Sequence, residues 1–257
     1  MKLWRLVQTG VGFAVFGAVV LLLGFVAIPL SRRLARAPAS DELRAQHWVH
    51  RGARVFIGYM KLVGLLRLDA VGAERLRAGR GLLLVANHPT LIDLVVLASL
   101  LPQLDCIVSA AWADNPFLRR TVVAAGYVRN DDGGSVVRAC LRLLKAGRSV
   151  VVFPEGTRSP PGGLRDFQAG AAFVALRSGQ PLVPVFLSCE PSTLTKGRSW
   201  YDVPAEQLHV TVRVGESILA QPVRYRDVTL PEAARRLTAE LREVFLKGLD
   251  IADVGTA

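Results

Sequence analysis

The stretch LLLVANHPTLID at residues 82–93 decides the fold of this chain. Its first five residues form an uninterrupted apolar run, which is typical of a strand with both faces buried. Further short apolar runs follow along the chain, at 105–109, 149–153, 182–188 and 209–214. Helical patterns separate them, at 91–101, 116–125, 135–146 and 169–178, with an amphipathic helix after Pro231. This alternation predicts an α/β domain whose active-site loops follow the ends of strands.

The composition favours one main domain with an anionic partner. A chain of 257 residues with 51% apolar residues can bury one α/β core without a second domain. The formal charge of +11 implies attraction to nucleic acid, an anionic bilayer or phosphorylated substrates. Because the basic residues are dispersed and form no nucleic-acid-reading motif, we expect no nucleic-acid partner. Three widely spaced cysteines show neither a disulfide nor a zinc pattern, which predicts reduced, buried thiols at Cys106, Cys140 and Cys189.

The N-terminal segment predicts a membrane anchor. Residues 11–30, VGFAVFGAVVLLLGFVAIPL, carry no charge, and a helix of this length can cross a hydrocarbon core of about 30 Å. The run exceeds the roughly 7–15 apolar residues of a secretory signal peptide, which favours an anchor over a cleaved leader. More basic residues follow the run (Arg32, Arg33, Arg36, Arg44) than precede it (Lys2, Arg5). By the positive-inside rule, we expect the protein in the inner (cytoplasmic) membrane, with its body on the cytoplasmic side.

We therefore expect three parts: an anchor at 1–36, a linker at 37–68 and the main domain at 69–257. Within the linker, residues 51–67 mix basic and apolar side chains. They form either an amphipathic helix along the bilayer interface or a helix packed on the core, and the sequence does not choose between the two.

The first motif is the segment after the apolar run, in which His88 and Asp93 are the candidates for chemistry. Five positions along a regular helix would turn the two side chains about 140° apart, so they can meet only across a turn. Pro89 and Thr90 supply that turn. Once they meet, the carboxylate can accept a hydrogen bond from one imidazole nitrogen and leave the other as a base. Taken alone, the pair fits better with a capped turn followed by a capped helix.

The second motif, FPEGTRS at 153–159, also follows a predicted strand. Arg158 offers a planar fork suited to phosphate, and Gly156 lets the backbone approach a ligand closely. The alternative is an exposed turn in which Glu155 pairs with Arg158, an interaction worth little. The loop lacks the GxxxxGK[ST] pattern, so it does not indicate nucleotide-triphosphate chemistry.

The two motifs together resemble the glycerolipid and lysophospholipid acyltransferases, including the 1-acylglycerol-3-phosphate acyltransferases. The resemblance covers roughly residues 70–220 and includes two weaker blocks, GYVR at 126–129 and LVPV at 182–185. It implies an α/β fold with a mixed sheet flanked by helices. It also implies a general base, His88, and its orienting partner, Asp93. The acceptor would be held by Glu155, Gly156, Thr157 and Arg158, with Arg129 as a second phosphate contact.

The resemblance further implies the reaction and its partners. An acyl-CoA or an acyl carrier protein would donate a fatty acyl group directly to the hydroxyl of a lysophospholipid, most simply 1-acylglycerol-3-phosphate. No cofactor or metal is implied, and membrane lipids would surround the protein. An alternative of another class is a non-catalytic, membrane-tethered lipid-binding protein, which would have no need of a base beside an orienting carboxylate.

Departures from the family pattern leave the acceptor open. The block around Arg129 runs into Asn130-Asp131-Asp132, and Gln168 stands where many members carry a lysine. Both changes lower the positive charge expected around a glycerol phosphate. Other acceptors therefore remain, including lyso-aminolipids and carriers of polyene or other specialised chains. Three residues after the last strand of the LVPV block either shape an acyl groove or form a surface loop: Lys196, Trp200 and Tyr201.

Overall fold

The structure of the protein is a computed structural model that describes residues 2–34, 40–195, 197, 199, 201–220 and 227–251. Arg36, Lys196 and Trp200, which entered the expectations above, lie outside the described residues. Tyr201 lies in a turn and is 62% exposed.

Seven strands form one sheet, in the order β1-β7-β6-β2-β5-β3-β4. Their bounds are β1 Leu66–Val71, β2 Leu83–Ala86, β3 Asp105–Ser109, β4 Val128–Asn130, β5 Val150–Val152, β6 Leu182–Glu190 and β7 Leu208–Val214. Neighbouring strands are parallel except β6 and β7, which are antiparallel. The predicted α/β fold with a mixed sheet is therefore confirmed. The apolar runs missed β1 and β4, and β1 begins before the expected domain boundary at 69.

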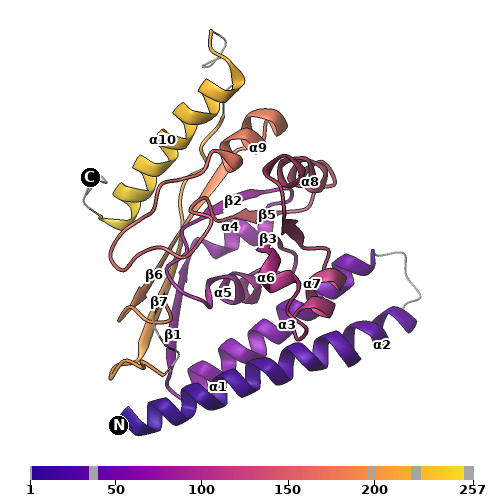
Figure 1. Cartoon of the computed structure of the whole chain (residues 1–257), viewed down its shortest axis with the longest axis vertical. Helices are drawn as coiled ribbons and strands as arrows, with labels where there is room; N and C mark the ends of the chain where they lie inside the picture. The colour runs from indigo at the N-terminus through magenta and orange to yellow at the C-terminus, as the bar shows by residue number, and fades with distance from the viewer. Residues whose placement is uncertain are drawn as a thin grey trace.

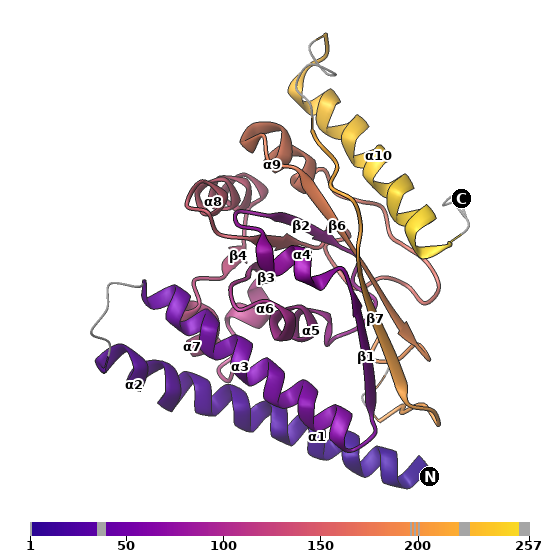
Figure 2. The ribbon, with the colours of Figure 1, turned by 180° about the vertical axis from the view of Figure 1, so that it is seen from behind.

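Helices cover both faces of this sheet (Figure 1 and Figure 2). On one face lie α3 (Asp41–Leu62) and α5 (Asp93–Leu100), and on the other lie α8 (Gly133–Lys145), α9 (Gly170–Ser178) and α10 (Leu230–Leu249). Shorter helices complete the chain: α4 (Ala73–Ala78), α6 (Ala110–Ala113) and α7 (Arg119–Ala124). In β2, Leu84 packs into the first layer, whereas Leu83 and Val85 pack into the second. Burial on both faces is why this strand is apolar without alternation.

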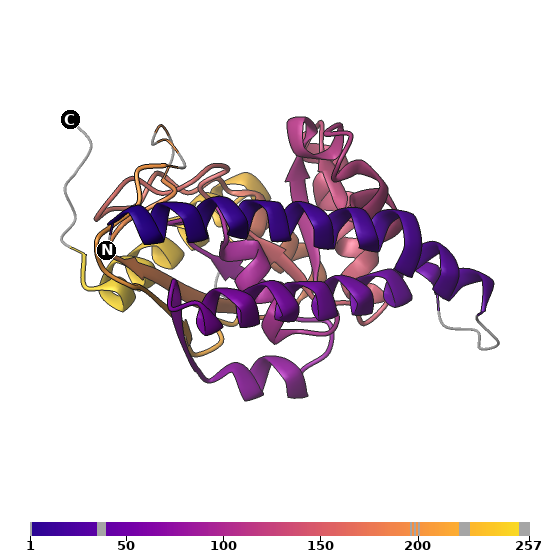
Figure 3. The ribbon, with the colours of Figure 1, turned by 90° about the horizontal axis from the view of Figure 1, so that it is seen from below.

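The N-terminal segment is one long apolar helix that lies along α3 (Figure 3). It comprises α1 (Lys2–Leu22), a π-helical turn η1 (Leu23–Ala27) and α2 (Ile28–Arg33). The 31 residues Leu3–Arg33 are long and apolar enough to cross a membrane. Yet one face contacts α3 at several levels, since the Tyr59 hydroxyl donates to Gln8 Oε1 and the rings of Phe16 and Phe56 meet at 5.3 Å. Apolar side chains of the opposite face are exposed, including Leu3, Trp4, Val7, Val11, Leu22, Phe25, Val26 and Leu30.

Residues 51–67 pack on the core, which is one of the two alternatives that the sequence left open. Most of the segment is the carboxyl-terminal half of α3, and its inner face, with Phe56, Ile57 and Met60, is buried in the core. Its outer face leaves Val55 62% and Leu62 87% exposed. The helix is therefore packed on the core and still presents apolar side chains outward.

A buried polar cluster ties α3 to the sheet. Asp105, at the start of β3, is fully buried and accepts hydrogen bonds from Gln46 at 2.8 Å, Gln103 at 2.9 Å and Arg148 Nε at 2.8 Å. Arg148 also pairs with Glu42 on α3. Burial raises the pKa of the Asp105 carboxyl, and the hydrogen bonds from Arg148 oppose that rise. This cluster fixes the position of α3, and with it the helix α1 that α3 carries.

Candidate active site

The first motif closes into a turn at the carboxyl end of β2. His88 Nδ1 lies 2.8 Å from Asp93 Oδ2. Thr90 closes the turn, because its backbone N–H donates to Asp93 Oδ2 at 2.7 Å and its hydroxyl donates to Oδ1 at 2.6 Å. Asp93 is 1% exposed, so its carboxylate is held away from water by these donors. With Nδ1 donating to Asp93, the Nε2 atom of His88 is left as an acceptor, as a general base requires.

Two neighbours fix the ring and backbone of His88. The side chain of Asn87 is buried and bonds to the backbone of Leu187 on β6, which anchors the residue before the histidine. The Phe153 ring stacks on the imidazole, with centroids 4.5 Å apart and planes 27° apart. The orientation of His88 is therefore set from the neighbouring strands β6 and β5.

Glu155 joins the second motif to the first. It is 4% exposed, and its Oε1 accepts from the His88 backbone N–H at 3.2 Å and from the Ser159 hydroxyl at 2.5 Å. Its Oε2 accepts from the Arg165 backbone N–H at 2.8 Å. In the part of the chain that the structure describes, Glu155 and Arg158 make no ion pair, so the salt-bridged turn is absent there. Glu155 organises the loop, and the other residues of this motif that line the cavity are Phe153, Pro154, Gly156, Thr157 and Arg158.

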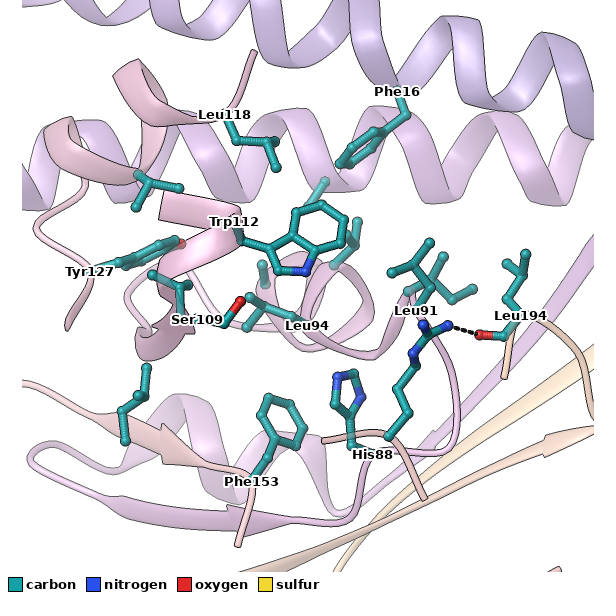
Figure 4. Close-up of a pocket in the computed structure, with 18 of the residues that line it drawn as sticks. Phe16, His88, Leu91, Leu94, Ser109, Trp112, Leu118, Tyr127, Phe153 and Leu194 are labelled. Carbon is teal, nitrogen blue, oxygen red and sulfur yellow. Dashed lines mark hydrogen bonds between the residues drawn. The ribbon is translucent and has the colours of Figure 1, made fainter. Parts of the chain in front are cut away.

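A cavity of about 680 Å³ opens beside His88, within the range of small-molecule sites. Apolar side chains from α1, α5, α6 and the following segments line most of it. Figure 4 labels several of these: Phe16, Leu91, Leu94, Trp112, Leu118 and Tyr127. The cavity thus places an apolar chain-binding volume directly against a candidate base.

Arg158 and Gly156 shape the polar part of the cavity. One guanidinium nitrogen of Arg158 donates to the Leu194 carbonyl at 2.6 Å, the dashed contact in Figure 4. Within the described part of the chain, no other partner of this guanidinium is found, which leaves N–H groups for a ligand, since a guanidinium has five. Gly156 has φ +66°, a left-handed backbone conformation that strains a residue with a Cβ, so this position favours glycine.

Arg129 lies elsewhere. Its side chain is 44% exposed and pairs with Asp114 and Asp131, and these hydrogen bonds raise its pKa. The described residues that line the cavity include its neighbour Asn130 but not Arg129 itself. The structure therefore does not bring Arg129 together with the other predicted site residues.

Several residues of the site were not singled out from the sequence. Asn87 and Ser159 lie inside the two motifs but were not predicted as site residues, and Thr90 was predicted only as part of the turn, not as a donor to Asp93. Phe16 and Trp112 gave no signal, because an aromatic residue in an apolar stretch looks like ordinary core.

Comparisons with known proteins bear on both the fold and the family of this chain. A solved structure described as the 1-acyl-sn-glycerophosphate (LPA) acyltransferase PlsC from Thermotoga maritima matches the whole of both chains with a TM-score of 0.74 at 19% identity. The two proteins thus share a fold. The sequence model of the family described as Acyltransferase matches residues 67–188, which include both motifs. Residues 67–188, just under half of the chain, therefore match this acyltransferase family, as the resemblance of the two motifs indicated.

Curated relatives agree with this assignment. A 1-acyl-sn-glycerol-3-phosphate acyltransferase from Arabidopsis thaliana is 36% identical over 108 residues, which are 40% of this chain and 30% of that protein. A second from Brassica napus is 35% identical and is matched over 31% of its length. The human 1-acyl-sn-glycerol-3-phosphate acyltransferase beta is 27% identical over 70% of this chain and 64% of its own. The chain therefore matches about a third of the two plant relatives and nearly two thirds of the human one.

Proposed function

We propose that the protein transfers a fatty acyl group from an acyl thioester to the hydroxyl of a lysophospholipid. The observation that carries this proposal is the His88–Asp93 pair, which faces an apolar cavity of about 680 Å³ with Arg158 on the same wall. The volume suits an acyl chain, and the pair suits removal of a proton from a hydroxyl.

The reaction is a direct transfer. Nε2 of His88 takes the proton of the acceptor hydroxyl while the oxygen attacks the thioester carbonyl. A C–O bond forms and the C–S bond breaks, and the departing thiolate takes the proton back from the imidazolium. Asp93 keeps the imidazole in the required tautomer and stabilises its charged form. The donor is a thioester of coenzyme A or of acyl carrier protein, and the scheme is complete without a metal or cofactor.

The acceptor in this proposal is 1-acylglycerol-3-phosphate, the compound in the names of the curated relatives. Arg158 and Thr157 would hold its phosphate next to the base. A second candidate is another lipid acceptor, favoured by the absence of Arg129 from the cavity among the described residues. A purely lipid-binding role fits less well. Three hydrogen-bond donors, one from His88 and two from Thr90, orient the Asp93 carboxylate, and a protein that only binds lipid has no need of that arrangement.

The protein would work at the inner membrane, with its catalytic domain on the cytoplasmic side. The exposed apolar face of α1 and α2 would contact the bilayer, and arginines at the end of α2 would lie at the head groups. Both the lysophospholipid and the product reside in that bilayer.

The direct test presents radiolabelled acyl thioesters to a panel of lysophospholipids and lyso-aminolipids, with detergent-solubilised protein. We expect the wild type to acylate 1-acylglycerol-3-phosphate and His88→Ala to lose at least about 10²-fold in kcat. Transfer to another acceptor alone would keep the mechanism and change the substrate. Equal activity of wild type and His88→Ala would refute the proposal.

A further inference from the structure

Gln168 follows the second motif and belongs to the wall of the cavity. Its backbone N–H donates to the Pro154 carbonyl at 2.8 Å, which pins the residue against the second motif. Its amide nitrogen covers Gly156, where a Cβ would come within 2.8 Å. The side chain is exposed and lines the cavity together with His88 and Arg158. Among the described residues, no hydrogen-bond partner of this carboxamide is found, so its donor and acceptor groups are available to a ligand.

The formal charge around His88 is low. Arg158 is the cation that the second motif contributes to the cavity wall, and one of its N–H groups is already bonded to Leu194. The same two motifs hold two buried acidic groups, Asp93 and Glu155. A second arginine that lines the cavity, Arg5, comes from the far N-terminal helix. A neutral carboxamide over Gly156 adds hydrogen bonds to this wall but no positive charge.

The charge of the acceptor therefore matters. A phosphomonoester such as 1-acylglycerol-3-phosphate carries about −1.5 to −2 at neutral pH, by analogy with phosphorylated side chains. A phosphodiester lysophospholipid carries a single charge and presents an ester oxygen and a polar head group instead. One guanidinium with a neutral hydrogen-bonding partner balances a single charge better than two.

We infer that Gln168 determines which acceptor head groups the site accepts, and that it lets phosphodiester lysophospholipids serve as acceptors beside the phosphomonoester. Its carboxamide hydrogen-bonds a phosphate or head-group oxygen of the acceptor while Arg158 balances the charge. The inference rests on the proposed function, since it concerns the acceptor of the same reaction.

The test measures kcat/KM for two acceptors with the same acyl chain, lysophosphatidate and lysophosphatidylglycerol, in mixed micelles of fixed composition. The variant is Gln168→Lys, and the matched control is Gln180→Lys, which adds the same charge beyond the end of α9 at a residue that does not line the cavity. A ratio of two kcat/KM values for one enzyme cancels effects on folding and on the ionisation of the base.

We expect the wild type to use both acceptors within about tenfold of each other, and Gln168→Lys to shift the ratio toward lysophosphatidate by about fivefold or more. Gln180→Lys should leave the ratio unchanged. Wild-type use of lysophosphatidylglycerol at under about a hundredth of the lysophosphatidate value would overturn the inference. So would equal shifts in the two lysine variants. Absence of transfer to either acceptor would instead refute the proposed function itself.

A second measurement needs no variant. In the wild type, lowering the pH from about 8 to about 5.5 protonates the phosphomonoester and leaves the phosphodiester unchanged. The ratio should therefore move toward lysophosphatidate as the pH falls. A ratio that stays flat or moves the other way would contradict the inference.

Discussion

Asn87 and Leu187 are 100 positions apart in the chain, yet they exchange two hydrogen bonds of 2.8 Å each. The side-chain amide of Asn87 donates to the Leu187 carbonyl, and its carbonyl oxygen accepts from the Leu187 backbone N–H. The pair is buried, and it joins the end of β2 to the middle of β6 at the residue before His88. A side chain thus takes over backbone pairing where β2 ends and the turn that holds His88 begins.

We expect Asn87→Ala to lower the free energy of unfolding by about 2–4 kcal/mol, because two buried backbone groups of Leu187 lose their partners. Activity should fall with it, since His88 loses its anchor. Urea unfolding followed by circular dichroism in detergent measures the first effect. His88→Ala is the matched control, and it should remove activity while changing stability by less than about 1 kcal/mol. Equal stability of Asn87→Ala and wild type would mean that the exchange contributes nothing net.

Thr90→Val keeps the volume of the turn but removes the hydroxyl that donates to Asp93 at 2.6 Å. We expect kcat to fall about tenfold with little change in the acceptor KM, because the carboxylate that orients His88 becomes less well held. Thr90→Ser restores the hydroxyl and should recover most of the rate. If the serine variant were as slow as the valine variant, packing of the methyl group and not the hydrogen bond would explain the loss.

Steady-state kinetics can distinguish the roles of Arg158 and Arg129 in acceptor binding. Arg158→Ala should raise the acceptor KM about tenfold, because a guanidinium on the cavity wall would be lost. Arg129→Ala should leave that KM within about twofold, since its guanidinium pairs with Asp114 and Asp131 outside the cavity. Initial rates at varied acceptor concentration measure both. A comparable rise in the two variants would restore Arg129 as the second phosphate contact that the family resemblance implies.

The central residues of this site could be predicted from the sequence because they lie in two short segments, each directly after a buried strand. Both motifs follow buried apolar strands, and β2 and β5 are parallel neighbours with Leu83 opposite Val150. Parallel neighbours end at the same edge of a sheet, so the two loops must meet. The turn between His88 and Asp93 was also predictable, because no helix can bring those two positions together.

The outer parts of the site depend on contacts that no short segment contains. The apolar run at 11–30 gives no sign of which face packs on α3, so the contribution of Phe16 to the cavity was not foreseen. Arg129 pairs with Asp114, 15 positions earlier in the chain, and this ion pair holds its side chain outside the cavity. Strand β4 reads Val128-Arg129-Asn130, so it holds a single apolar residue and gives no apolar run.

The three cysteines should be inert in the folded protein, as expected for buried thiols. Burial raises the pKa of Cys140, which lines the cavity, to about 11 and that of Cys189 to about 12. Because the pKa of Cys140 is higher in the folded protein than in the unfolded chain, the folded state favours the neutral thiol. The contribution of this thiol to the free energy of unfolding is complete below the pKa of the unfolded chain, and it is lost as the pH rises through about 11. We expect iodoacetamide to label none of the three at about pH 8 before unfolding, as read by mass spectrometry. Stoichiometric labelling of the native protein within minutes would contradict this.

The two faces of α1 should have separable roles. Val7 and Val11 point outward and are 50% and 43% exposed, whereas Phe16 points into the cavity. We expect Val7→Gln/Val11→Gln to weaken binding to liposomes about tenfold or more in flotation, because polar amides replace apolar area that would meet lipid. The kcat of this double variant in detergent should stay near that of the wild type. Phe16→Ala should do the reverse, keeping liposome binding and raising KM for long-chain donors, because it removes part of the cavity wall. If both variants lost binding and activity together, α1 would act only as a structural element, because a membrane role and a cavity role on opposite faces of one helix must respond independently.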